Sequence, residues 1–188
     1  MAGLNEGHME ITKELAAKVL EIVDAGLVSG LGKPKPGHMC VEAAVNYALG
    51  APHGDEPVCV GRAVRAFKIR LNDARWPTNK DRTDGMRKLA IAQLGSNTID
   101  QNGFRKYVAL HTVKRILPIA LRATGSLIPA HKDALEASAA ACEVIVDFSA
   151  ARVVASAALE KVRAARADDA AYRCALPGPL HQLALRIV

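Results

Sequence analysis

Aromatic residues are scarce in this chain of 188 residues. Phe, Tyr and Trp make up only 4% of the sequence, although 50% of its residues are hydrophobic. Any core must therefore be built from Ala, Leu, Val and Ile, and such small side chains favour closely spaced helices over a sandwich of strands. No segment shows the alternation of apolar and polar residues that is typical of a half-buried strand. We expect an all-α protein.

Long apolar runs are also missing. None reaches the roughly 18 uninterrupted residues that a membrane-spanning helix needs, so we expect no membrane partner. The first residues lack a basic start followed by an apolar stretch, the pattern typical of a secretory signal. We therefore expect a cytoplasmic protein whose four cysteines stay reduced.

The common catalytic motifs are absent as well. The sequence contains no GxxxxGK[ST], GxGxxG, GxSxG or HExxH, so phosphate-loop, dinucleotide, serine hydrolase and zinc-protease chemistries have no support.

Helical spacing of apolar residues, together with Gly and Pro breakers, predicts about six helices in a single helical domain. Thr12 is a candidate N-cap for the first helix, Gly50 is a candidate C-cap for the second, and Pro118 is expected to kink the fifth. We assign residues 1–128 to a basic helical domain. Residues 129–188 are expected to form a long Ala-rich helix and a short tail, packed on the same domain or on a partner chain.

The Ala-rich segment has its own pattern. Between Ala134 and Ala175, 16 of 42 residues are alanine, and neither Gly nor Pro interrupts them. Apolar or small residues recur there at alternating spacings of four and three, as in a coiled coil. They are Leu135, Ala139, Cys142, Val146, Ser149 and Val153. We therefore expect a homo-oligomer that assembles through this helix.

The segment PGHMCVEAAVNYALGAPHGDEPVC, residues 36–59, gathers histidines, cysteines and acids around one short helix. In one interpretation Cys40 is a nucleophile, because the first turn of a helix lowers the pKa of a thiol. Residues 40–50 weakly resemble the nucleophile helix of papain-like cysteine peptidases. The sequence offers no sheet to hold a base, which leaves His111 and His131 as candidates.

A second interpretation is a zinc site. His38, Cys40, His53 and Cys59 have the spacing H-x-C-x12-H-x5-C, and zinc accepts mixed nitrogen and sulfur ligands in tetrahedral sites. The tight CxxC spacing of a strong zinc motif is missing. In the third interpretation, which we favour, these residues cap helices, form turns or pack as small apolar groups.

Positive charge is concentrated in the middle of the chain. The net charge is +6, but residues 62–122 alone hold 14 Lys and Arg against four Asp. Phe67 and Trp76 lie among these basic residues, a composition compatible with phosphate contacts and base stacking. The candidate nucleic-acid-binding residues are Arg62, Arg65, Lys68, Arg70 and Arg75. The alternative is that these charges only solvate helix faces.

Three stretches, MCVEAAVNYALGAPHGDEPVCV, IRLNDARW and GMRKLAIAQLGS, are followed by the Ala-rich segment. Together they resemble bacterial hypothetical proteins that have no assigned activity. The resemblance implies a single cytoplasmic helical domain in a bacterium, and it transfers no site residue. The sequence as a whole predicts a non-catalytic helical protein that binds nucleic acid or an acidic protein through a basic surface. The alternative is a thiol- or zinc-dependent function centred on Cys40 and His53.

Overall fold

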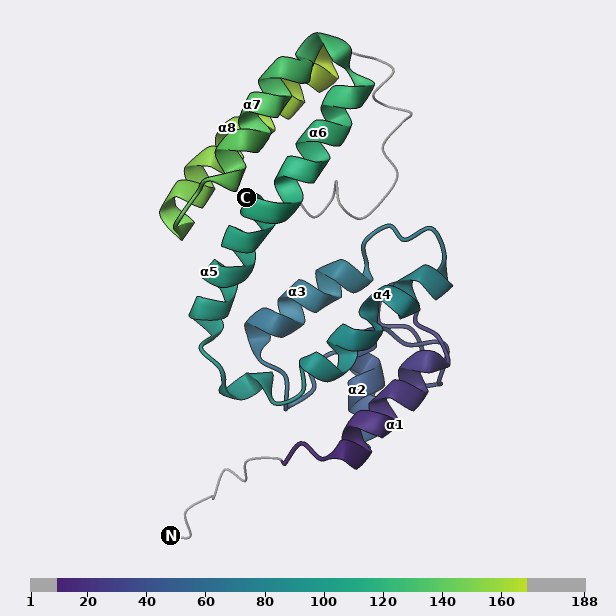
Figure 1. The fold of residues 1–188 in the computed structure, drawn as a ribbon. Helices are drawn as coiled ribbons and strands as arrows, with labels where there is room; N and C mark the ends of the chain where they lie inside the picture. Colours follow the sequence, from purple (N-terminus) through teal and green to yellow (C-terminus); the bar gives the residue numbers. More distant parts are fainter. Residues whose placement is uncertain (1–9, 169–188) are drawn as a thin grey trace. The chain divides into compact units, whose positions relative to one another are not determined.

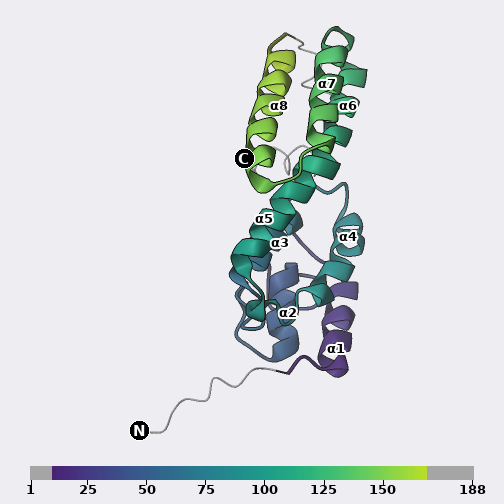
Figure 2. The ribbon, with the colours of Figure 1, turned by 60° about the vertical axis from the view of Figure 1, so that its left-hand side comes forward.

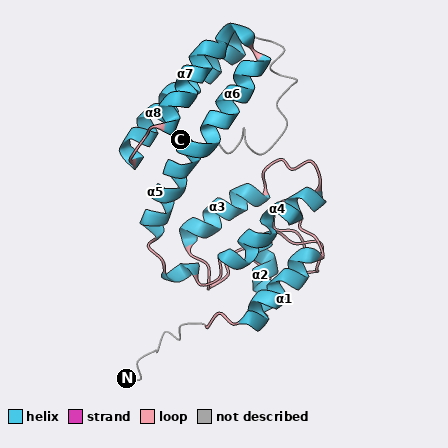
Figure 3. Cartoon of the chain, viewed as in Figure 1, coloured by secondary structure: helices cyan, strands magenta, loops and turns pink. Residues whose placement is uncertain are grey.

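The computed structural model describes residues 10–168 and is all-α over this range, which confirms the predicted fold class. Figures 1 and 3 show helices joined by loops. Within the described residues no strand forms, and the β-type backbone pairing is limited to isolated bridges from Met39 to Leu27 and Gly32. No helix in residues 10–168 combines the length and the apolar character needed to cross a bilayer.

The chain divides into two compact units, the first ending at Gln101 and the second beginning at Asn102. The described helices of the first unit are α1 (Lys13–Asp24), α2 (Val41–Leu49), α3 (Arg62–Asn72), α4 (Asn79–Ala92) and the 3₁₀ turn η1 (Ser96–Thr98). Next come α5 (Gln101–His111), the π turn η2 (Thr112–Ile116), α6 (Leu117–Leu127), the 3₁₀ turn η3 (Pro129–His131), α7 (Lys132–Glu143) and α8 (Phe148–Asp168).

This division differs from the expected boundary at residue 128. Leu117 and Leu121 of the segment before that boundary are buried in the same apolar cluster as Leu135 and Ala139 of α7. Since α6 and α7 share one core, a boundary between them would separate the apolar groups that stabilise both helices.

Helix α2 lies at the centre of the first unit, because α1, α3 and α4 all pack against it. Val41, Ala44 and Val45 of α2 are fully buried. The short helix is flanked by Cys40 at its N-cap and by Gly50 at its C-cap, and the left-handed backbone of Gly50 (φ 69°) confirms the predicted glycine C-cap. The predicted N-cap of α1 is also confirmed, since the Thr12 hydroxyl accepts a hydrogen bond from the Leu15 N–H at 3.2 Å.

The loop between α1 and α2 is held by the end of α3. The Asn72 side chain donates to the Val28 carbonyl at 2.9 Å and accepts from the Val41 N–H at 3.3 Å. The neighbouring Asp73 carboxylate accepts from the Gly30 N–H at 2.7 Å. These bonds fix the start of α2 against α3.

In the second unit, α5 continues into α6 through the π turn η2, directly before Pro118. Proline has no N–H and its ring clashes with the carbonyl four residues earlier, so a regular α-helix cannot pass through it undisturbed. The irregularity expected at Pro118 therefore takes the form of a wide turn.

The Ala-rich segment is two helices within the described residues, where we expected one. Helix α7 ends at Glu143 and α8 begins at Phe148; α8 supplies the predicted long C-terminal helix. Figure 2 shows α7 and α8 as neighbours joined by a short turn, and they pack against each other. The segment 144–146 reads Val-Ile-Val, and such β-branched residues lose side-chain freedom in a helix.

The predicted coiled-coil seam is divided by this break. Leu135, Ala139 and Cys142 are buried inside the unit, whereas Val146 is 81% exposed and Val153 is 68% exposed. Self-association through the Ala-rich segment stays a prediction. The end of that segment, including Cys174, lies outside the described residues.

Asp147 caps α8, because its carboxylate accepts from the Ala150 N–H at 2.8 Å and its carbonyl accepts from the Ala151 N–H at 3.0 Å. We expect Asp147→Ala to lower the free energy of unfolding by about 1 kcal/mol, since an N–H at the helix start loses its acceptor. Asp147→Asn should remain near the parent value because an amide oxygen also caps. Urea unfolding followed by circular dichroism measures both variants, and equal stability of Asp147→Ala and the parent would contradict this account.

Candidate functional site

Cys40 acts as the N-cap of α2. Its thiol sulfur accepts a hydrogen bond from the Ala43 N–H at 3.4 Å, and the residue is only 5% exposed. Burial raises the pKa of this thiol, and the charges of Glu42 and Asp73 raise it further. A nucleophilic cysteine requires the opposite shift. The burial of Cys40 agrees with the small apolar role that we favoured for it, and its role as an N-cap was not predicted.

The four candidate zinc ligands have separate surroundings. The His53 ring nitrogen Nε2 lies 3.2 Å from the Gly32 carbonyl oxygen. Cys40 and Cys59 are buried, and His38 is exposed. In the part of the chain that the structure describes, no three His, Cys, Asp or Glu side chains are grouped so that they could hold a metal ion. The zinc interpretation stays a prediction.

The unexpected feature of this region is a buried ion pair between α2 and α3. Glu42 is 0% exposed and Lys68 is 2% exposed, and the Lys68 Nζ lies 3.5 Å from the Glu42 Oε1. The prediction that Lys68 belongs to an exposed basic surface is therefore wrong. A signal was present in the sequence, since Lys68 follows Val64 by four residues and so shares its apolar helix face.

Burial dominates the electrostatics of the pair. It raises the pKa of Glu42 to about 7, although Lys68 and Arg65 favour the carboxylate. It lowers the pKa of Lys68 to about 8, although Glu42 favours the ammonium form. The two groups attract each other at 3.5 Å, but among the described residues neither makes a hydrogen bond to a protein group. Taking both charges out of water costs free energy that the attraction only partly offsets.

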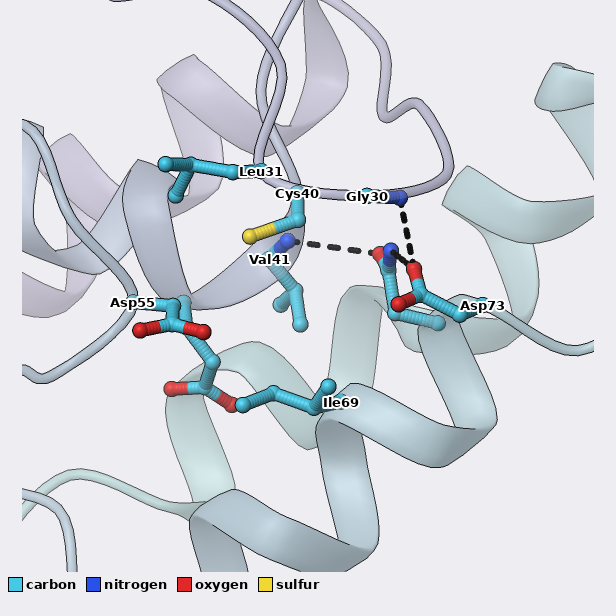
Figure 4. A pocket seen from close by; sticks show the side chains of 9 residues that line it. Gly30, Leu31, Cys40, Val41, Asp55, Ile69 and Asp73 are labelled. Atoms are coloured by element: carbon cyan, nitrogen blue, oxygen red, sulfur yellow. Dashed lines mark hydrogen bonds between the residues drawn. The ribbon is translucent and has the colours of Figure 1, made fainter.

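A small crevice of about 20 Å³ is lined in part by Glu42 (Figure 4). Figure 4 shows Asp55 on one side of the crevice and Asp73 on the other, where the Asp73 carboxylate accepts a hydrogen bond from the Gly30 N–H. The volume holds about one water-sized group. A carboxyl group with a pKa near 7 exchanges protons at neutral pH. The residues that line the crevice are Gly30, Leu31, Cys40, Val41, Glu42, Asp55, Ile69, Asn72 and Asp73.

The other predicted basic residues differ in their surroundings. Arg62, Arg70 and Arg75 are exposed. Arg65 is half-buried and forms an ion pair with Glu56 of the loop before α3. Three of the five candidate residues therefore remain on the open surface.

The aromatic residues near α3 have structural roles or are half-buried. The Trp76 ring nitrogen donates to the Leu71 carbonyl at 2.9 Å, and the ring covers Gly85 of α4 so closely that a Cβ there would clash. Phe67 is half-buried. The expectation that these two rings stack on bases is therefore not supported by their positions.

The chain matches no known protein family, no curated protein and no solved structure. Its resemblance to bacterial helical proteins stays a prediction, and the functional inference depends on the geometry of the described residues.

The ion pair predicts strong coupling between its two residues. Lys68→Met leaves the buried Glu42 carboxyl without its cation and should lower the free energy of unfolding, by up to about 3–5 kcal/mol at a pH where that carboxyl is charged. The variant Glu42→Gln/Lys68→Met should lose clearly less than the sum of the two single changes. Urea unfolding measures the free energy of unfolding of the parent, the two single variants and the double variant. Lys80→Met, which breaks the exposed ion pair with Asp84, is the control and should lower the free energy of unfolding much less than Lys68→Met. Additive single effects would refute the coupling.

The pair also predicts a minimum in stability near neutral pH. The folded pKa of Glu42 lies above its ordinary value of 4.5, so the folded state binds the extra proton and stability falls as pH rises from about 4.5 to 7. The folded pKa of Lys68 lies below 10.5, so the unfolded state binds the extra proton and stability rises from about pH 8 to 10.5.

The measurement is the free energy of unfolding of the parent minus that of Glu42→Gln/Lys68→Met, from pH 4 to 10.5. This difference should be lowest between pH 7 and 8 and change by on the order of 1–3 kcal/mol on either side. A difference that is constant with pH would show that neither group titrates in these ranges.

Proposed function

We propose that this protein binds nucleic acid without catalysis, through the exposed arginines of α3 and the turn that follows it. One observation carries the proposal: α3 contains no Asp or Glu, and its residues Arg62 and Arg70 are exposed, as is Arg75 just beyond its end. A cytoplasmic location belongs to the same proposal.

The helix geometry supports a shared surface. Arg62 and Arg70 are eight residues apart, so at 3.6 residues per turn they lie about 80° apart around the axis of α3. Lys68 lies well away from both in this projection, in keeping with its burial against α2. The helix therefore has a basic outer face and an apolar inner face that carries one buried cation.

Arginine suits this role because its planar guanidinium binds phosphate oxygens with two parallel hydrogen bonds. Contacts of this type position a protein on the backbone and carry no information about base sequence. We therefore propose binding with little sequence preference. An acidic protein is the second candidate partner, since the same charges would attract carboxylates.

The proposal is tested with a fluorescent 20-base-pair duplex and anisotropy at several salt concentrations. Binding should weaken steeply with salt. The logarithm of the binding constant should fall linearly with the logarithm of the salt concentration, with a slope of roughly 0.9 for each phosphate neutralised. Arg62→Gln/Arg70→Gln should lower the slope by about two and weaken binding to unrelated duplexes equally. The control is Lys13→Gln/Lys18→Gln, which makes the same charge change on exposed residues of α1. It should change the duplex affinity and the salt slope less than the α3 variant does.

Two outcomes would contradict the proposal. Binding that does not change between low and moderate salt would exclude a phosphate-based interface. Equal effects of the α1 and α3 variants would show that only the total charge matters, and the duplex binding would then say nothing about α3.

A further inference from the structure

The helical segment from α5 to the start of α7 carries positive charge without acidic residues. Residues 101–132 contain six Lys and Arg and no Asp or Glu. On α5, Tyr107 is 63% exposed, and its ring centroid lies 4.2 Å from that of His111. Tyr107 is thus presented to solvent, next to the half-buried His111, on a helix with no carboxylate of its own.

The surroundings of this pair are basic. Tyr107 and His111 are spaced by four residues, so they lie on successive turns of one face of α5. Arg115 follows four residues later, in η2. Arg115 and Lys106, which precedes Tyr107 in the chain, are both exposed. His111 directly precedes the π turn η2, and such wide turns occur frequently at functional sites. We call Lys106, Tyr107, His111 and Arg115 the α5 stripe.

We propose that the α5 stripe binds single-stranded nucleic acid, with an unpaired base stacked on the exposed Tyr107 ring beside His111 and the adjacent phosphates held by Lys106 and Arg115. Exposed aromatic rings beside cations are the usual means by which proteins bind single strands, because every base has a face to stack. In a duplex that face is covered by the neighbouring base pairs. The inference rests on the proposed nucleic-acid binding and adds a preference for single strands.

The rings of Tyr107 and His111 are tilted by 47° to each other. They are therefore not stacked face to face, and the exposed Tyr107 ring keeps surface for a base. This contrasts with Trp76, whose ring is packed against Gly85. If the ring contacts a protein partner instead, Tyr107→Leu will leave oligo-dT binding unchanged.

The experiment uses the full chain and two fluorescent probes, a 20-nucleotide oligo-dT and a mixed-sequence duplex of the same length. Tyr107→Leu keeps an apolar side chain but removes the ring, and should weaken oligo-dT binding by about tenfold, within the range for losing one base–aromatic contact. Tyr107→Phe should bind like the parent. Duplex binding should be unchanged in both. Ile119→Ala, an exposed apolar residue of α6, is the control.

The outcomes are distinct. If Tyr107→Leu binds oligo-dT like the parent while Arg62→Gln/Arg70→Gln loses duplex binding, the stripe is not a base-stacking site and the proposed function stands. If Tyr107→Leu weakens both probes equally, the single-strand preference is wrong. If the parent binds neither probe at low salt, the proposed function fails and the stripe is better assigned to a protein partner. Circular dichroism of each variant shows whether it is folded like the parent. Tyr107→Phe, which keeps the ring, is the conservative change with which Tyr107→Leu is compared.

Discussion

The arrangement of the first unit depends on the ion pair between Glu42 and Lys68. Both groups are removed from water, and each is tolerable in the core only because the other lies 3.5 Å away. The pair lies at the contact between α2 and α3. The end of α3 then holds the loop before α2 through Asn72 and Asp73, and α1 and α4 pack on the helix so placed.

The same pair determines what α3 offers to solvent. With Lys68 turned inward, Arg62 and Arg70 lie on the outer side, and the helix combines a structural cation with exposed ones. Composition cannot separate these roles, because every basic residue adds equally to the net charge. The functional proposals therefore rest on which cations are exposed and not on how many the chain contains.

Helix ends were the part of the fold most readily predicted from the sequence. Thr12 and Gly50 cap helices through interactions within a few residues, so local patterns find them. The break before Asp147 was missed because alanine-rich flanks favour helix, and a capping acid without Gly or Pro is a weak signal. The buried pair was missed because it joins residues 26 positions apart in sequence, and its only local sign is one charged residue in each of two apolar helix faces.

The most direct test of this account is an NMR titration of the Glu42 side-chain carboxyl carbon in the folded protein. The account predicts an inflection near pH 7, because burial opposes the charge on that group more than Lys68 supports it. Lys68→Met should move the inflection higher still, since the favourable cation is lost. An inflection near the ordinary value of 4.5, unmoved by Lys68→Met, would show that Glu42 is hydrated and unpaired, and would contradict the arrangement of α2 and α3 described above.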